Sequence, residues 1–329
     1  MTAQAMAELW RGGRMESRHL GHAVICGPGG EVVQAWGDAD ALIYPRSSCK
    51  MIQALPLMES GAGAGLPDRL VALACASHQG AAMHVQAVTR WLADMDMSEA
   101  DLRCGAHEPN DRDERDRLIR AHEAPCQCHN NCSGKHSGFL MMNRHIGGDP
   151  EYVDPDHPLQ RAIRQASDEV TGEASPGYGI DGCSAPNFAM TITGLARAMA
   201  AFANATGTGD ARDRAMHRLT RAMAAHPEMV AGKGRACTEL MQAMGGRVTV
   251  KTGAEAVFVA ILPEQRTGIA LKITDGGTRA AEAAICALLV RAGMLDPAHP
   301  AALKRLDAVQ RNWRGREVGI VRAAEGFPA

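Results

Sequence analysis

Strand patterns at both ends of the chain enclose a long helical middle, and this order limits the folds available to it. Residues 20–36 predict a hairpin, because two β-prone runs flank the turn Gly27-Pro28-Gly29-Gly30. Further strands are predicted near the C-terminus at 248–251, 256–262 and 267–273, before a closing helix at 277–292. We therefore expect one sheet that contains segments from both ends of the chain.

The middle of the chain has apolar residues at helical spacing in most segments. A helix led by Ser47 is expected to end at Gly61. Clear helices are expected after it at 67–74, 81–95, 158–170, 186–204 and 210–225. The expected fold class is α/β (α+β), an antiparallel sheet with an inserted all-helical lobe in a single two-lobed domain. The expected bounds are approximately 1–60 and 246–329 for the sheet lobe and approximately 61–245 for the helical lobe, within residues 1–329.

Composition excludes several classes of partner. The 329 residues carry a formal net charge of -2 and no basic block, so nucleic acid is not an expected partner. No segment has the roughly 18 consecutive apolar residues that a membrane span needs. The N-terminal residues contain no apolar signal-peptide core, so the ten cysteines are expected to be reduced thiols in the cytoplasm.

Ser47 and Lys50 form a Ser-x-x-Lys motif where a turn leads into a helix. Positions i and i+3 of a helix share a face, so the hydroxyl and the amine can meet, and a neutral lysine can activate a serine nucleophile. This spacing is common by chance, but Lys251-Thr252-Gly253 is its companion motif in serine enzymes that acylate themselves. The usual third motif, Ser-Asp-Asn, is absent, and Lys251 could instead be a solvent-exposed strand lysine.

Two further polar positions each have a structural and a functional interpretation. Ser77 precedes the helix expected at 81–95, so it either caps that helix or directs its hydroxyl into a cleft. Asp181 lies in a glycine-flanked loop before another expected helix. It either caps that helix or binds the amino group of an amino-acid substrate.

The densest group of soft metal ligands lies between residues 126 and 136. Cys126-x-Cys128-His129 and Cys132 belong to it, and Cys183 could join from a later loop. Thiolates and imidazoles suit zinc, although the spacing is not that of paired Cys-x-x-Cys motifs. The alternative is that these thiols are small buried hydrophobic residues.

Several segments together resemble the Rhizobium-type L-asparaginases, also called the class 3 or asparaginase II family. The matches follow the family's order from about residue 20 to about residue 290. They are YPRSSCKMIQALPL (44–57), ASHQG (76–80), CGAHEP (104–109), HNNCSGKHSGFL (129–140), GIDGCSAPNFAMTITGLA (179–196), KGRACTELM (233–241) and KTGAEAVF (251–258). Of these, NCSGKHSGFL and DGCSAPNF are far more specific than Ser-x-x-Lys.

The resemblance implies a serine-β-lactamase-like fold, shared with the serine-dependent glutaminases, and a single catalytic domain. It also implies hydrolysis of L-asparagine to L-aspartate and ammonia, with little activity on glutamine. By this resemblance Ser47 is the nucleophile, Lys50 is its activating partner, and Ser77 with Lys251 forms a second Ser–Lys pair. A homodimer is implied as well.

The same resemblance implies a zinc ion held by Cys132, Lys135 and Cys183, which tunes substrate affinity rather than generating the nucleophile. A lysine that binds a metal must lose its proton first.

For substrate binding the resemblance implies an amino-acid site. Asp181, beside Gly182, is expected to bind the α-ammonium group, and Arg46 or His136 to contact the carboxylate or the side-chain amide.

Other functions remain open from the sequence. One alternative with the same fold is a serine-dependent glutaminase, another amidohydrolase or a penicillin-reactive acyl-transferring enzyme. An alternative of a different class is a non-catalytic, zinc-responsive binding protein built on a hydrolase scaffold. Amide turnover separates the last from the others, and the preferred amide separates asparaginase from glutaminase.

Overall fold

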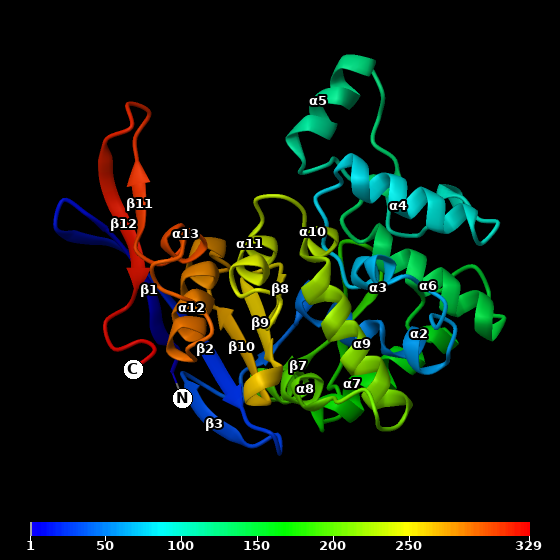
Figure 1. The fold of residues 1–329 in the computed structure, drawn as a ribbon, viewed down its shortest axis with the longest axis horizontal. Helices are drawn as coiled ribbons and strands as arrows, with labels where there is room; N and C mark the ends of the chain where they lie inside the picture. Colours follow the sequence, from blue (N-terminus) through cyan, green and yellow to red (C-terminus); the bar gives the residue numbers. More distant parts are fainter. Residues whose placement is uncertain (1) are drawn as a thin grey trace. The chain divides into compact units, whose positions relative to one another are not determined.

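The computed structural model describes residues 2–329, which divide into two compact units (Figure 1). The sheet unit comprises the chain up to Ser48 together with Met190–Asn204 and Glu239–Ala329. The helical unit comprises Cys49–Ala189 and Ala205–Thr238. Relative to the lobes expected from sequence, the chain enters the helical unit earlier and returns once to the sheet unit. That the two units act as one catalytic domain stays a prediction.

The sheet unit contains an eight-stranded antiparallel sheet among the described residues. The strand order is β11-β12-β1-β2-β10-β9-β8, and β3 also pairs with β2. The strands are β1 (Gln4–Arg11), β2 (Arg14–Cys26), β3 (Val32–Trp36), β8 (Thr249–Gly253), β9 (Val257–Leu262), β10 (Thr267–Ile273), β11 (Ala308–Arg311) and β12 (Glu317–Ala323). The α/β class and the sheet built from both chain ends are therefore confirmed.

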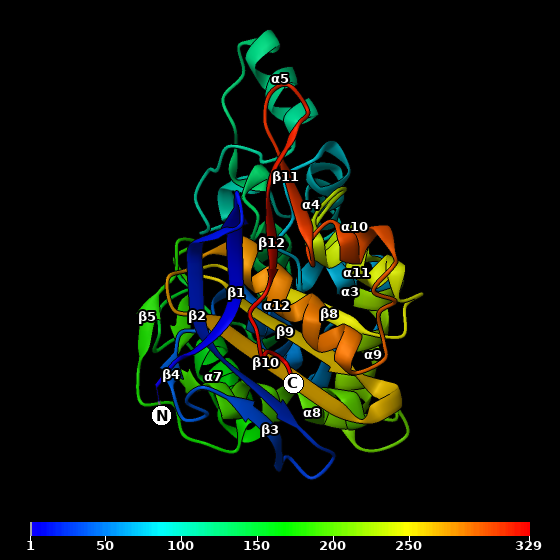
Figure 2. The same ribbon diagram turned by 90° about the vertical axis from the view of Figure 1, so that its left-hand side faces the viewer.

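Two helices of the same unit pack on this sheet, α8 (Ile192–Asn204) and α12 (Thr278–Arg291). Both contact β9 and β10, and Figure 2 shows α12 lying across the strands that it contacts. Every residue of β9 is buried. Because successive side chains of a strand point to opposite faces, both faces of the sheet are covered at β9. The short helices η4 (Pro263–Gln265) and α13 (Pro300–Leu303) complete the unit.

The close packing of α8 on the sheet depends on Gly268 in β10. A Cβ atom added at this position would overlap with the backbone of Ala196 and Ala200 in α8. No rotamer change relieves an overlap with backbone atoms, so a side chain here would separate the helix from the strand. Only glycine allows the observed approach.

The helical unit contains most of the remaining helices. These are α1 (Lys50–Gln53), α2 (Leu55–Glu59), α3 (Asp68–Ala74), α4 (Ala82–Ala93), η2 (Glu99–Asp101), α5 (Arg112–Ala121), η3 (Gln127–His129), α6 (Ser133–Ile146), α7 (Pro158–Thr171), α9 (Ala211–Ala225) and α10 (Pro227–Val230). At its centre, α3 contacts α6, α9 and α10. The contact between α3 and α6 requires Gly134, where an added Cβ would overlap with the backbone of Leu73. η1 (Arg46–Cys49) and α11 (Ala236–Ala243) cross the boundary between the units.

Two helices expected from sequence are wrong in part. The segment from Ser47 to Gly61 is η1, α1 and α2 rather than one helix. Pro56 lies in the first turn of α2 and cannot donate to the carbonyl four residues earlier, so α1 ends and a new helix begins.

The helix expected over 186–204 begins only at Ile192, because its first part is extended. Pro186–Phe188 (β6) pairs with β5 (Tyr178–Ile180), and Met190–Thr191 (β7) pairs with β4 (Leu42–Ile43). A proline at a helix start and a proline at a strand start look alike in sequence, and pairing with distant strands decided between them.

Among the described residues, every helix falls short of the length and hydropathy that a membrane span requires.

Gly268→Ala is expected to lower the free energy of unfolding by about 3 kcal/mol, because the added methyl group meets backbone rather than a movable side chain. Urea denaturation of the full chain measures the effect. Gly65→Ala is the matched control, since a Cβ there meets nothing within 4 Å, and it should change stability by less than about 0.5 kcal/mol. Equal stability of the two variants would show that α8 does not need this close approach.

Candidate active site

The turn that carries Ser47 lies in the sheet unit. The Ser48 backbone N–H and the Ser48 hydroxyl both donate to Pro45 O, at 3.2 and 2.7 Å. Arg46 has a φ of 52°, a left-handed conformation that costs a non-glycine residue free energy. Ser47 itself is half-buried. A strained, hydrogen-bonded turn therefore fixes the backbone on both sides of this serine.

Strand β8, with the Lys251-Thr252-Gly253 motif, lies against the same turn. A Cβ atom at Gly253 would be 2.7 Å from Pro45 O and 3.0 Å from Ser48 N, so glycine is required for the contact. Lys251 is fully buried, and its Nζ donates to Thr252 O at 2.7 Å. The alternative that Lys251 is a solvent-exposed strand lysine is wrong. The structure thus places the Ser47 turn and the Lys-Thr-Gly strand side by side within the sheet unit.

Lys50, at the start of α1, is the centre of a second cluster in the helical unit. Its Nζ lies 2.5 Å from Ala76 O, 3.1 Å from Ser77 Oγ and 3.1 Å from Cys132 Sγ. The side chain is 1% exposed. The structure therefore joins Lys50 to Ser77, and to a cysteine that was expected to bind metal.

Backbone contacts hold the segments of this cluster together. The Ser77 N–H donates to Val230 O at 2.8 Å. His78, next in the chain, donates its N–H to Asn131 O at 3.2 Å, and its Nε2 lies 2.9 Å from Ser133 Oγ. Asn130 Oδ1 accepts the N–H of Cys132 at 2.8 Å. The loop after α3 and the start of α6 are thus fixed against each other, which places Ser77 and Cys132 on either side of the Lys50 amine.

Cys132, Lys135 and Cys183 form a buried chain of soft donors. Lys135 Nζ lies 3.0 Å from Cys183 Sγ, and Cys132 is hydrogen-bonded to Cys183. Cys183 reaches the cluster from the loop between β5 and β6, where Ser184 has a φ of 68°. All three side chains are at most 4% exposed.

The charge distribution in this chain follows from its contacts. The Cys132 hydrogen bond and then the Lys135 charge outweigh burial and hold the pKa of Cys183 well below its ordinary value. The contact with Cys183, together with burial, holds the pKa of Cys132 well above its ordinary value. Burial opposes the charge of Lys135, but Cys183 and Cys132 together raise its pKa. Without a metal, these contacts therefore favour the charged forms of Cys183 and Lys135 and the neutral form of Cys132.

His136, one residue further along α6, is oriented by Tyr152. The Tyr152 hydroxyl accepts the N–H of Arg103 at 2.8 Å and lies 2.9 Å from His136 Nδ1. Burial, with the charge of Lys135, lowers the pKa of His136 to about 4, so the ring is neutral. The buried hydroxyl proton needs an acceptor, and Nδ1 is the acceptor in contact, so Nε2 carries the ring proton. His136 is also hydrogen-bonded to Cys183, and Nε2 is the ring nitrogen that Tyr152 leaves for this contact.

Asp181 and Gly182 lie at the start of the loop that carries Cys183. Asp181 Oδ1 accepts the N–H of Gly182 at 2.8 Å, and the Asp181 N–H donates to Ala185 O at 3.0 Å. Asp181 is half-buried and Gly182 is exposed. Asp181 thus shapes its own loop and precedes a strand, so the expectation that it caps a helix is wrong. Its role toward a substrate stays a prediction.

The residues present fit the zinc ion that the family resemblance implies. A tetrahedral zinc ion with a sulfur ligand and a nitrogen ligand separates those two atoms by about 3.6 Å, against 3.0 Å here between Lys135 Nζ and Cys183 Sγ. A shift of less than an ångström accommodates the ion. The contacts that lower the pKa of Cys183 favour its thiolate, which is the form that binds a metal.

The expected site residues thus fall into two groups. Arg46, Ser47 and Lys251 belong to the sheet unit. The others belong to the helical unit and are Lys50, Ser77, Cys132, Lys135, His136, Asp181, Gly182 and Cys183. The pairing of Ser47 with Lys50 and that of Ser77 with Lys251 each join residues of different units, and both stay predictions.

The sequence analysis missed three residues that position the site, Arg103, Asn130 and Tyr152. Each acts over a long range of sequence, since Tyr152 joins Arg103 to His136 and Asn130 Nδ2 donates to Cys104 O at 2.9 Å. No local pattern marks Arg103 or Tyr152. Only Asn130, inside the segment HNNCSGKHSGFL, had a sequence signal.

The sequence pattern of the L-asparaginase II family matches residues 7–323 of the chain. A search of curated proteins found no match.

Several solved structures are similar in fold. A β-lactamase from Mycobacterium bovis is 14% identical, with 82% of this chain and 94% of that chain covered and a TM-score of 0.46. A protein named Mglu, in its native form, is also 14% identical, with 89% and 69% covered and a TM-score of 0.47. The D-alanine carboxypeptidase AmpC from Burkholderia cenocepacia is 13% identical, with 83% and 93% covered and a TM-score of 0.41. At these identities and TM-scores the similarities do not assign an activity.

Tyr152→Phe is expected to lower the free energy of unfolding by about 1–3 kcal/mol, because it leaves the Arg103 N–H and His136 Nδ1 buried without partners. Urea denaturation measures the change. Tyr178→Phe removes a hydroxyl from an exposed tyrosine of the same unit and should cost less than about 0.5 kcal/mol. If both variants lose the same stability, the buried hydroxyl does not link these two groups.

Proposed function

We propose, since this chain belongs to the L-asparaginase II family, that it is an amidohydrolase which converts L-asparagine to L-aspartate and ammonia through a serine acyl-enzyme. The observation that carries the serine mechanism is the contact of the Ser47 turn with β8, where Gly253 packs against Pro45 and Ser48. It brings the serine end of the Ser-x-x-Lys motif to Lys-Thr-Gly, and these two motifs occur together in self-acylating serine enzymes.

In the acylation step, Ser47 Oγ attacks the carbon of the substrate's side-chain amide. The hydroxyl proton passes to Lys50, or to the Ser77–Lys251 pair, and then to the leaving nitrogen. Backbone N–H groups at the start of η1, with one from the strand segment 251–254, stabilise the oxyanion, and one such donor is typically worth about 3 kcal/mol. The C–N bond breaks, ammonia leaves, and Ser47 holds a β-aspartyl ester.

In the deacylation step, water attacks the same carbonyl carbon and transfers a proton to the amine that accepted the first one. The ester C–O bond breaks, the proton returns to Ser47 Oγ, and L-aspartate leaves. The base must be a neutral amine at the start of each step. Lys50 Nζ donates to Ala76 O, Ser77 Oγ and Cys132 Sγ, and these contacts hold the amine in place.

Substrate binding is assigned to side chains that offer a hydrogen-bond donor or a charge to an amino acid. His136 is a buried neutral ring beside Cys183, and its Nε2–H can donate to a carboxylate or an amide oxygen of the substrate. Asp181 supplies a carboxylate for the α-ammonium group, and Arg46 supplies a positive charge beside Ser47. Recognition of both α groups favours a free amino acid over a peptide.

Cys132, Lys135 and Cys183 are proposed to hold a zinc ion. When bound, the ion would supply a fixed positive charge that strengthens binding of the anionic substrate. Lys135 must release its proton for this role, while Lys50 keeps its contact with Ser77 and remains available as the base.

Ser47→Ala is expected to lower the rate of ammonia release from L-asparagine by at least about 10⁴-fold, because no covalent intermediate can form. A coupled ammonia assay and intact-protein mass spectrometry measure turnover and acylation. Ser48→Ala is the matched control, since that hydroxyl donates to Pro45 O and should affect stability more than turnover. An active Ser47→Ala protein would remove the serine mechanism, while turnover of glutamine in preference to asparagine by the natural chain would make it a glutaminase.

Cys132→Ser and Cys183→Ser are each expected to remove one equivalent of bound zinc and to raise KM for L-asparagine at least tenfold, with a smaller change in kcat. Elemental analysis and steady-state kinetics measure the two effects. Cys26→Ala, which removes a buried thiol of the sheet unit, should change neither. Unchanged zinc content and KM in both serine variants would refute the zinc role of these cysteines.

A further inference from the structure

A second group of thiols lies in the helical unit and has no role in the proposed reaction. The Sγ atoms of Cys126 and Cys128 and a carboxylate oxygen of Glu99 all lie within 4.8 Å of one another. Cys128 is buried, Cys126 is half-buried and Glu99 is exposed. We propose that these three residues bind a thiophilic divalent cation such as Zn²⁺, at a site separate from Cys132, Lys135 and Cys183.

The donor types and their spacing fit such an ion. Zinc binds thiolate at about 2.3 Å and carboxylate oxygen at about 2.0–2.2 Å. In a tetrahedral site these lengths separate the donors by roughly 3.5–3.8 Å, which is within the 4.8 Å that encloses the three atoms. The exposed side at Glu99 gives the ion an entry path and leaves room for water as a fourth ligand.

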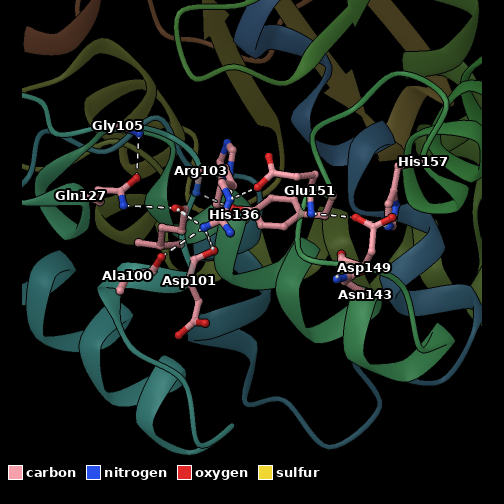
Figure 3. Close-up of polar contacts among 12 residues, drawn as sticks. Ala100, Asp101, Arg103, Gly105, Gln127, His136, Asn143, Asp149, Glu151 and His157 are labelled. Carbon is pink, nitrogen blue, oxygen red and sulfur yellow. Dashed lines mark hydrogen bonds and ion pairs between the residues drawn. The ribbon is translucent and has the colours of Figure 1, made fainter.

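Hydrogen bonds already hold the two segments of the site against each other. The Gln127 N–H donates to Glu99 Oε2 at 2.7 Å, and Gln127 Nε2 donates to Glu99 O at 3.0 Å and to Leu102 O at 3.1 Å. Gly105 N–H donates to Gln127 Oε1 at 2.8 Å, as Figure 3 shows. Gln127 lies between the two cysteines in the chain, so these contacts fix Glu99 beside them before any ion binds.

Two charged or polar side chains fix the outer parts of the site. Arg103 Nη1 donates to the carbonyls of Ala100, Asp101 and Leu102, which stiffens the loop after Glu99 (Figure 3). His129 Nδ1 accepts the Cys126 N–H at 3.0 Å and lies 3.2 Å from Cys126 Sγ. Donors that are held by such contacts lose little conformational entropy when they bind a metal.

A metal explains this group better than a disulfide between the two cysteines. A disulfide would need only the two thiols and would give the carboxylate of Glu99 no role. A zinc ion can use that carboxylate as a third ligand beside the two thiolates. The site lies just before Asn130, which holds the backbone of Cys132 at the start of α6. The ion would therefore stabilise the segment that leads into the proposed active site.

Cobalt(II) binding to the full-length chain tests the proposal without any measurement of activity. The Cys132→Ser/Cys183→Ser double variant, reduced with a phosphine and freed of metal by a chelator, is titrated with Co²⁺ alone. We expect one equivalent to bind with the near-ultraviolet absorption of thiolate–cobalt bonds. Cys126→Ser or Cys128→Ser in that background should abolish the absorption, and Glu99→Gln should weaken Co²⁺ binding at least tenfold.

Cys104→Ser is the matched control, because Cys104 is a buried thiol that contacts Gln127 O but lies outside the donor group. It should leave Co²⁺ binding unchanged. Zinc content supplies a second measurement if the multiple variants fail to fold, since Cys126→Ser in the otherwise natural chain should lose one equivalent of bound Zn²⁺. Three results would overturn the proposal. The first is that no thiolate absorption appears, and the second is that the absorption persists in Cys126→Ser and Cys128→Ser. The third is that the metal-free chain is lighter by two hydrogens, which would indicate a Cys126–Cys128 disulfide.

Discussion

The burial of the Lys50 amine is the constraint on which the helical unit's polar centre depends. An amine removed from water is costly unless its hydrogen bonds are replaced, and Lys50 is 1% exposed. Ala76 O, Ser77 Oγ and Cys132 Sγ replace the lost water contacts. These three atoms come from the loop after α3 and the start of α6, so the Lys50 side chain links α1 to both.

The neighbouring groups form one continuous buried network rather than isolated pairs. Cys132 contacts both Lys50 and Cys183, and Cys183 contacts Lys135. Such networks rarely improve stability over apolar packing, because every member loses hydration. Their value lies in shifted pKa values. Here the contacts favour a thiolate at Cys183, a thiol at Cys132 and a neutral imidazole at His136, all in one buried network. The arrangement suits the chemistry proposed better than it suits stability.

Local pattern was enough to predict the elements whose burial is regular. The strands at 248–251, 256–262 and 267–273 and the helix at 277–292 all appear with small shifts at their ends. β1, β11 and β12 were not predicted. In β11 and β12 few residues are buried, and in β1 four consecutive residues are buried, so none of the three shows a clear alternation.

For the site, the segments that carry Ser47, Lys251 and the cysteines were recognisable in the sequence. The serine, lysine and cysteine side chains in them were sufficient to suggest acyl transfer and a zinc site. The contacts between them were not, since the Lys50 amine meets Ser77 and Cys132 across 27 and 82 residues of sequence. Tyr152 had no signal at all, because its role depends on which residues the fold brings to its hydroxyl.

The pairing of the two chain ends in one sheet has a consequence for biosynthesis. Ala7 pairs with Ala323 and Ala23 pairs with Leu271, so β1 and β2 gain their central neighbours only when nearly the whole chain has left the ribosome. Contacts this distant in sequence close slowly. During translation the first hairpin exposes unpaired strand edges, and exposed edges are the places where nascent chains associate wrongly. The interrupted order of segments therefore leaves the first hairpin without its neighbouring strands until the C-terminal strands are available to pair with it.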